Sequence, residues 1–210
     1  MAAQRMASWT YAEHFPSVSD IIDQATRTAE ELDADPVPAS VGSLLRMLAA
    51  SVQAAHVVEI GTGAGISGLW LLGGMADDGV LTSIDLEPEH QRSARRAFAA
   101  AGVAPQRTRV ISGDANQVLP RLTDAAYDLV WIDADVASYP VYVEQAMRLL
   151  RPGGLLAVHH MLGADKVADP AARDASTVTL RDLGKQLRAD ERLVPALVAA
   201  GDGLLVAVRR

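Results

Sequence analysis

Three glycines at alternate positions, Gly61, Gly63 and Gly65, follow a short apolar run that ends at Ile60. A buried strand, a tight turn and the start of a helix would produce this pattern. Glycine suits such a turn because the backbone must bend sharply, and a ligand can approach it without meeting a Cβ atom. Free N–H groups at the start of the helix favour anionic or electron-rich ligand atoms. Glu59 lies inside the apolar run, where an unpaired carboxylate would be costly, so the segment is predicted to be a binding site.

Two cofactor-binding patterns match this loop. Gly63, Gly65 and Gly68 match G-x-G-x-x-G, the dinucleotide pattern, which is a weak signal when it stands alone. The stretch from Glu59 also reads E-x-G-x-G-x-G, which resembles motif I of S-adenosylmethionine (AdoMet) methyltransferases. We favour the second pattern because of Glu59 and of the residues downstream. A strand, turn and helix without any ligand is the third possibility.

Acidic residues recur where the downstream strands are expected to end. Asp85 follows the glycine loop by roughly 20 residues, where a carboxylate can accept hydrogen bonds from a ribose diol. Asp114 and Ala115 follow the next strand and suit an adenine edge, but Asp114 could equally cap a helix. Asp133 ends a fourth strand with Asp135 close by, and two acids at one strand end suggest a cation or ammonium group nearby.

Strands and helices are predicted to alternate from residue 57 onward. The expected strands are 57–60, 80–85, 108–112, 127–133, 155–159, 193–198 and 204–208, and the expected later helices are 88–101, 116–122, 139–150 and 175–189. The last two strands flank a glycine turn with no crossover helix, which predicts an antiparallel hairpin. The pattern therefore predicts an α/β fold with a Rossmann-like, doubly wound, mainly parallel seven-stranded sheet and an antiparallel C-terminal hairpin.

Residues 1–50 are predicted to form a helical N-terminal cap, and residues 51–210 the ligand-binding domain. One helix is expected over 20–32, capped by Ser17 or Ser19, and a second over 40–51. The segment 33–39 contains Pro36 and Pro38 and is predicted to be a linker.

Composition narrows the function classes. The 210 residues include no Cys, which excludes disulfides, thiolate metal sites and a cysteine nucleophile. A formal charge of −7 makes nucleic acid an unlikely partner. The N-terminal residues lack a continuous apolar segment, so neither a signal peptide nor a membrane span is expected, and a cytoplasmic location is predicted.

The chain resembles the class I AdoMet-dependent O-methyltransferases of the catechol and caffeoyl-CoA O-methyltransferase family, in its bacterial, actinobacterial-type branch. The resemblance covers roughly residues 37–209 and rests on VEIGTGAGISGLWL, SIDLEPE, SGDANQVLP, YDLVWIDAD, LLRPGGLLAV and GDGLLVAVR. It implies AdoMet as cofactor. The residues that it implies as cofactor-binding are Val37, Glu59, Gly61, Thr62, Gly63, Ser67, Asp85, Leu86, Asp114, Ala115 and Asp133.

The metal site of this family is altered. Metal-dependent members bind a divalent cation with the strand-four Asp, here Asp133, and an Asp-Asn pair that His159 and His160 replace. Two imidazoles suit zinc, iron or manganese better than magnesium, which prefers oxygen ligands. Adjacent strand residues point to opposite faces, so both rings can be ligands only if the strand has ended. We expect no metal site, with one His lining the pocket and the other packed behind it; if a metal binds, these three residues are its ligands.

The family's general base is also missing. Catechol-type members carry a Lys three residues after the strand-four Asp, and Val136 stands there. His159 is the predicted catalytic base, because imidazole titrates near neutrality. The alternative is that no base acts, and that an already ionised substrate reacts through proximity and desolvation.

The predicted function is O-methylation of a small hydroxylated molecule, phenol- or catechol-like. The alternatives are an AdoMet-binding protein with lost or regulatory activity, and a methyltransferase acting on a hydroxylated tRNA nucleoside. The loop after strand five lacks aromatics, so Trp9, Tyr11 and Phe15 are expected to wall the substrate site or, in preference, to form a dimer contact. A homodimer with the N-terminal helices as interface is predicted.

Overall fold

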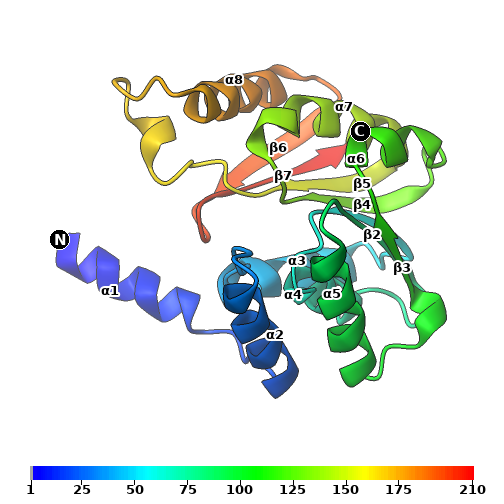
Figure 1. The fold of residues 1–210 in the computed structure, drawn as a ribbon. Helices are drawn as coiled ribbons and strands as arrows, with labels where there is room; N and C mark the ends of the chain where they lie inside the picture. The colour runs from blue at the N-terminus through cyan, green and yellow to red at the C-terminus, as the bar shows by residue number, and fades with distance from the viewer. Residues whose placement is uncertain (1) are drawn as a thin grey trace.

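The computed structural model describes residues 2–210, with side chains from residue 6 onward. One seven-stranded sheet forms its centre, in the order β3-β2-β1-β4-β5-β7-β6 (Figure 1). Strands β1 to β5 pair in parallel, whereas β7 pairs antiparallel with both β5 and β6. The strands are β1 (His56–Ile60), β2 (Val80–Asp85), β3 (Thr108–Ser112), β4 (Tyr127–Ile132), β5 (Leu150–Val158), β6 (Leu193–Val198) and β7 (Leu204–Arg209). The predicted α/β fold, including its antiparallel hairpin, is confirmed.

Helices cover both faces of the sheet (Figure 1). Helices α6, α7 and α8 lie on one side, and α3, α4 and α5 lie on the other. The helices are α1 (Ala2–Glu13), α2 (Asp20–Glu31), α3 (Ala39–Ser51), α4 (Ile66–Leu72), α5 (Pro88–Ala100), α6 (Ala115–Val118), α7 (Tyr139–Leu149) and α8 (Ala175–Ala189). Short 3-10 turns stand at Pro105–Arg107, Leu119–Arg121, Val136–Ser138 and Lys166–Ala168.

The central strands are apolar on both faces because helices bury both. In β4, Leu129 and Trp131 belong to the core on the α3–α5 side, whereas Val130 and Ile132 belong to the core under α6–α8. All four are fully buried. Strands with two buried faces read as continuous apolar runs, which explains why YDLVWID shows no polar alternation.

The N-terminal helices differ in how closely they join this body. Helix α1 extends away from the rest of the fold (Figure 1). By contrast, Val41, Leu45 and Ala49 of α3 are fully buried in the core shared with the sheet. Ser19, not Ser17, caps α2 by accepting a hydrogen bond from the Ile22 N–H. The division of the chain at residue 50 stays a prediction.

Two predicted boundaries were wrong by several residues, both at prolines, whereas the others agree within a residue. Strand β5 begins at Leu150 rather than 155, and the sheet register jumps between Tyr127 and Leu129 of the partner strand. Pro152 has no N–H to donate, and Gly153 takes a φ of +79°, so the segment bulges instead of ending the strand's pairing. Helix α6 ends at Val118, and a 3-10 turn containing Pro120 continues it.

Among residues 2–210, no helix is long and apolar enough to cross a bilayer.

Candidate active site

The glycine loop after β1 runs against the end of β4. A Cβ atom at Gly61 would lie 1.8 Å from the carbonyl oxygen of Asp133, and Gly61 has a φ of +97°. Only glycine permits this approach. A Cβ at Gly63 would meet nothing within 4 Å, although its φ of +49° also favours glycine. The two glycines therefore serve different purposes: Gly61 allows the strands to close, and Gly63 leaves open space in front of the loop.

Asp85, at the end of β2, holds this loop in place. Its Oδ2 accepts hydrogen bonds from the backbone N–H groups of Thr62 and Gly63, each at 2.9 Å. Its Oδ1 accepts another from the Glu87 N–H at 2.8 Å. The His90 Nδ1 lies 3.4 Å from Oδ2. The carboxylate thus ties together the loops that follow β1 and β2.

Glu59 is completely buried beneath the loop. The hydroxyls of Ser67 and Ser83 donate hydrogen bonds to its two carboxylate oxygens, at 2.6 and 2.5 Å. Burial raises the pKa of Glu59 to about 7, and the nearby charges of Asp133 and Asp85 add to this effect against the two hydroxyls. The Glu59 carboxyl group therefore exchanges between its protonated and ionised forms near neutral pH.

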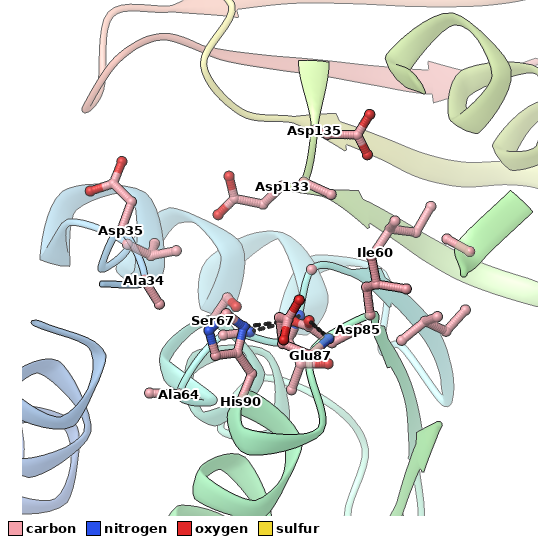
Figure 2. Close-up of a pocket in the computed structure, with 18 of the residues that line it drawn as sticks. Ala34, Asp35, Ile60, Ala64, Ser67, Asp85, Glu87, His90, Asp133 and Asp135 are labelled. Carbon is pink, nitrogen blue, oxygen red and sulfur yellow. Dashed lines mark hydrogen bonds and ion pairs between the residues drawn. The ribbon is translucent and has the colours of Figure 1, made fainter. Parts of the chain in front are cut away.

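A cavity of about 540 Å³ opens in front of the loop, at the carboxyl ends of β1, β2 and β4. Figure 2 shows Asp133 and Asp35 on one side of it and Asp85 with His90 on the other. All the predicted cofactor-binding residues except Glu59 line this cavity. The carboxylates that line it are those of Asp35, Asp85, Glu87, Asp114, Asp133 and Asp135. Such a lining favours a ligand that carries positive charge.

Asp114 caps a helix and also lies at the cavity wall, and its contact with an adenine edge stays a prediction. Its side chain caps α6 by accepting a hydrogen bond from the Asn116 N–H at 2.9 Å. Asp114 and the buried Ala115 also line the cavity. The cap fixes the carboxylate beside the space that a ligand would occupy.

Two histidines meet Asp133 at the end of β5. The Oδ1 atom of Asp133 lies 3.1 Å from the His159 Nδ1 and 3.3 Å from the His160 Nε2. The other ring nitrogen of His160 lies 3.2 Å from the Oδ2 atom of Asp202, in the turn between β6 and β7. Hydrogen bonds from the two histidines lower the pKa of Asp133 despite its burial. Asp133 and Asp202 raise the pKa of His160 to about 9 against the effect of burial.

The two rings differ in their access to the cavity. His160 lines it, whereas His159 is 2 % exposed and packs behind, against Trp131. The expectation that one ring lines the pocket and the other lies behind it agrees with this placement. The strand has nevertheless ended at Val158, so both rings face Asp133, which was the condition for their acting together.

Comparisons with known proteins identify the family. The model of the O-methyltransferase family matches residues 12–210. The chain belongs to the O-methyltransferase family. A protein of Mycobacterium tuberculosis named "Probable O-methyltransferase" is 52% identical over 201 residues, which cover 96% of this chain and 90% of the relative. The enzyme therefore uses AdoMet, as the E-x-G-x-G-x-G pattern predicted.

Solved structures of the family share the whole fold of this methyltransferase. A Corynebacterium glutamicum protein superposes with a TM-score of 0.90 at 31% identity, covering 100% of this chain and 97% of that chain. The O-methyltransferase TomG of Streptomyces achromogenes, involved in tomaymycin synthesis and solved with AdoMet, gives 0.85 at 28% identity, covering 95% and 94%.

The cavity of the methyltransferase suits this cofactor. AdoMet carries positive charge on its sulfonium and its amino group, and the lining is rich in carboxylates. The volume lies within the range of roughly 300–1,000 Å³ that is usual for ligand pockets. Gly63 gives the cofactor a close approach to the loop backbone.

Several residues of this site were not predicted. Asp35, His90 and Tyr142 line the cavity, and Asp202 supports it through His160. His90 carried a signal, because it lies in the first turn of the helix that follows Asp85. Asp35 came from the predicted linker, where the sequence gives no periodicity to interpret. Val136, in the position of the family lysine, packs against the core and does not line the cavity.

Proposed function

We propose that this methyltransferase transfers the AdoMet methyl group to a hydroxyl of a small phenol- or catechol-like molecule, without a magnesium site. The observation that carries this proposal is the acid-lined cavity at the carboxyl ends of β1, β2 and β4, which meets the glycine loop. Ligands of open α/β sheets bind at this edge, where the strand order reverses. Here the reversal falls between β1 and β4.

The cofactor would be held at its methionine part and at its adenosine part. Gly61, Thr62 and Ser67, over the buried Glu59, would take the methionine part, with Val37 close by. Asp85 would take the ribose hydroxyls, and Leu86, which is 67% exposed at the cavity mouth, would cover the adenine ring.

The adenine edge and the methyl donor would be contacted from opposite sides of the cavity. Asp114 and Ala115 would contact the adenine edge, because the helix cap already orients Asp114. Asp133 would lie beside the sulfonium, where its charge is complementary. Transfer would be an in-line displacement: the bond from methyl carbon to substrate oxygen would form, the bond from methyl carbon to sulfur would break to leave the neutral thioether, and the hydroxyl proton would pass to a base or to solvent.

The hydroxyl proton could be lost in two ways, with the help of His159 or without any base. The catalytic role predicted for His159 stays a prediction, and its buried ring meets the cavity only through Asp133. His159 would therefore hold the Asp133 carboxylate in position rather than touch the substrate. A substrate that is already ionised needs no base, and binding beside the cofactor in the cavity would supply proximity and desolvation.

A substrate panel tests this proposal. The purified enzyme is incubated with AdoMet and separate catechols, phenols and their methyl ethers, and S-adenosylhomocysteine and methylated product are measured by mass spectrometry. We expect product from hydroxylated members and none from the ethers. Cofactor binding without any product would favour the non-catalytic alternative, and methyl transfer to bulk tRNA would favour the nucleoside alternative. The homodimer and the cytoplasmic location also stay predictions.

A further inference from the structure

Three potential metal ligands converge at the end of β5. Asp133, His159 and His160 each offer one donor atom, and these atoms lie within 4.8 Å of one another. The Asp133 Oδ1 is 3.1 Å from one imidazole nitrogen and 3.3 Å from the other. Donors around a tetrahedral ion with bonds of about 2.0–2.1 Å stand roughly 3.3 Å apart. The two separations from the Asp133 Oδ1 are close to this value, and the two imidazole nitrogens lie within 4.8 Å of each other.

A strained backbone brings the second ring into this cluster. His160 has a φ of +56°, in the left-handed region that a residue with a side chain rarely adopts. The two imidazole rings lie 4.1 Å apart between centroids, instead of on opposite faces of the sheet. Such conformations are costly and cluster at functional sites.

A second carboxylate orients His160. The Nδ1 of His160 lies 3.2 Å from the Asp202 Oδ2, and the Oδ1 of Asp202 accepts a hydrogen bond from the Ala164 N–H at 2.8 Å. A carboxylate that holds the far nitrogen of an imidazole directs the near nitrogen's lone pair toward a metal. The Nε2 of His160 is the atom that faces Asp133.

Two further atoms near the cluster bear on metal binding: the second ring nitrogen of His159 and a carboxylate oxygen of Asp35. In this structure the Nδ1 of His159 donates to the Asp133 carboxylate at 3.1 Å, so an ion bound at Nδ1 would require the ring proton to move to Nε2, which is buried and has no hydrogen-bond partner among the described residues. The Oδ2 of Asp35 lies 3.8 Å from the His160 Nε2 on the cavity side. An ion bound here would face the cavity that the cofactor and substrate share.

This donor set does not suit the magnesium ion of metal-dependent relatives. Magnesium demands octahedral oxygen ligation, and two of the three converging donors here are imidazole nitrogens. We propose that Asp133, His159 and His160 bind a divalent transition metal of the zinc or iron(II) class in place of magnesium. Such an ion lowers the pKa of a coordinated hydroxyl. That catalytic use rests on the proposed function, whereas metal binding itself does not.

Metal titration without cofactor tests the site. The full chain, stripped with a chelator, is titrated with Zn²⁺ by calorimetry and with Co²⁺ by visible absorption. We expect one equivalent of each, with cobalt bands that report nitrogen ligation, and no binding of Mg²⁺ at millimolar concentration. His160→Gln should abolish stoichiometric binding, and Asp202→Asn should weaken it by about 10–100-fold.

Two comparisons keep the test decisive. His56→Gln, at the start of β1 and therefore at the opposite edge of the sheet, should bind zinc like the wild type. His159→Gln is buried, so its folding is checked by circular dichroism before its titration is interpreted. Absence of zinc and cobalt binding in a wild-type protein that binds S-adenosylhomocysteine would overturn the inference, as would binding retained in His160→Gln. Zinc binding with no methyl transfer would leave the site standing and count against the proposed function alone.

Discussion

The Oδ2 atom of Asp85 accepts a hydrogen bond from the backbone N–H of Thr62 at 2.9 Å, so the residue that ends β2 holds the loop that follows β1. The same carboxylate is the group expected to meet the cofactor's ribose. Loop order and cofactor binding are therefore linked through one side chain, and its removal should affect both.

Asp85→Ala should lower the free energy of unfolding by about 1–3 kcal/mol, because the N–H groups of Thr62 and Gly63 lose their acceptor. Its affinity for S-adenosylhomocysteine should fall at least about tenfold, which amounts to about 1.4 kcal/mol. Urea unfolding and calorimetry measure the two effects. Asp78→Ala, an exposed carboxylate before β2, is the matched control and should change neither. Unchanged cofactor affinity in Asp85→Ala would contradict the ribose assignment.

Gly61 and Gly63 should respond differently to alanine. Gly61→Ala places a Cβ 1.8 Å from the Asp133 carbonyl oxygen and should destabilise the fold by more than about 3 kcal/mol. Gly63→Ala meets no protein atom within 4 Å, so it should cost only about 1–2 kcal/mol for its left-handed backbone. Its methyl group would enter the cavity, and cofactor affinity should fall about tenfold or more, a loss of about 1.4 kcal/mol.

Gly102→Ala is the control for this pair. Gly102 has a φ of +71° with nothing within 4 Å of an added Cβ, and it lies after α5, outside the cavity lining. It should show the backbone cost of Gly63→Ala without the loss of S-adenosylhomocysteine binding. Equal binding by the Gly63 and Gly102 variants would show that the cofactor does not approach the loop at Gly63.

The exposed aromatic residues of the N-terminal segment predict how the chain associates. Trp9, Tyr11 and Phe15 are 55%, 72% and 74% exposed on and just after α1, which extends from the body (Figure 1). Clustered exposed apolar groups mark interaction surfaces. We expect the wild type to sediment as a dimer, and Trp9→Ser with Phe15→Ser to sediment as a monomer. Leu197→Ser, on the exposed edge strand β6, is the control. A wild type that is monomeric at every concentration would refute the dimer.

The carboxylates at the ends of the parallel strands could be predicted, because the topology of a parallel sheet brings these strand ends together. Asp85, Asp114 and Asp133 each follow the end of a parallel strand, and the carboxyl ends of such strands share one edge of the sheet. Periodicity located these strand ends within a residue, so the positions of these three carboxylates at the cavity followed from the chain alone. Glu59 is the exception, because a strand residue beneath the loop points into the core rather than toward the cavity.

The rest of the site depends on features that periodicity does not encode. Asp35 and Asp202 arrive from a proline-containing linker and from a hairpin turn, and only packing decides that both reach His160. Because β7 runs antiparallel to β5, the turn between β6 and β7 lies beside the carboxyl end of β5. The sequence does not show that β7, rather than β6, pairs with β5. The left-handed backbone of His160 overrides the strand alternation that would have separated the two rings.

Glu59 gives the enzyme a stability that falls as pH rises. Its folded-state pKa is about 7 against an ordinary value of 4.5, so between these limits the folded state binds more protons than the unfolded state. Stability is therefore fully present below pH 4.5 and is lost progressively up to about pH 7. The difference amounts to about 3 kcal/mol. Glu59→Gln does not titrate, and its amide can accept a hydrogen bond from one serine and donate to the other.

We therefore expect Glu59→Gln to gain stability relative to the wild type between pH 5 and pH 8, by about 2–3 kcal/mol in urea unfolding. Glu89→Gln is an informative comparison, because Arg92 lowers the pKa of the exposed Glu89 carboxyl. A lowered pKa contributes stability that is already fully present above pH 4.5, so the difference between Glu89→Gln and the wild type should stay nearly constant between pH 5 and pH 8. If the difference in free energy of unfolding between Glu59→Gln and the wild type is the same at both pH values, Glu59 is ionised throughout this range. The two serine hydroxyls and the loop would then outweigh the cost of burying its charge.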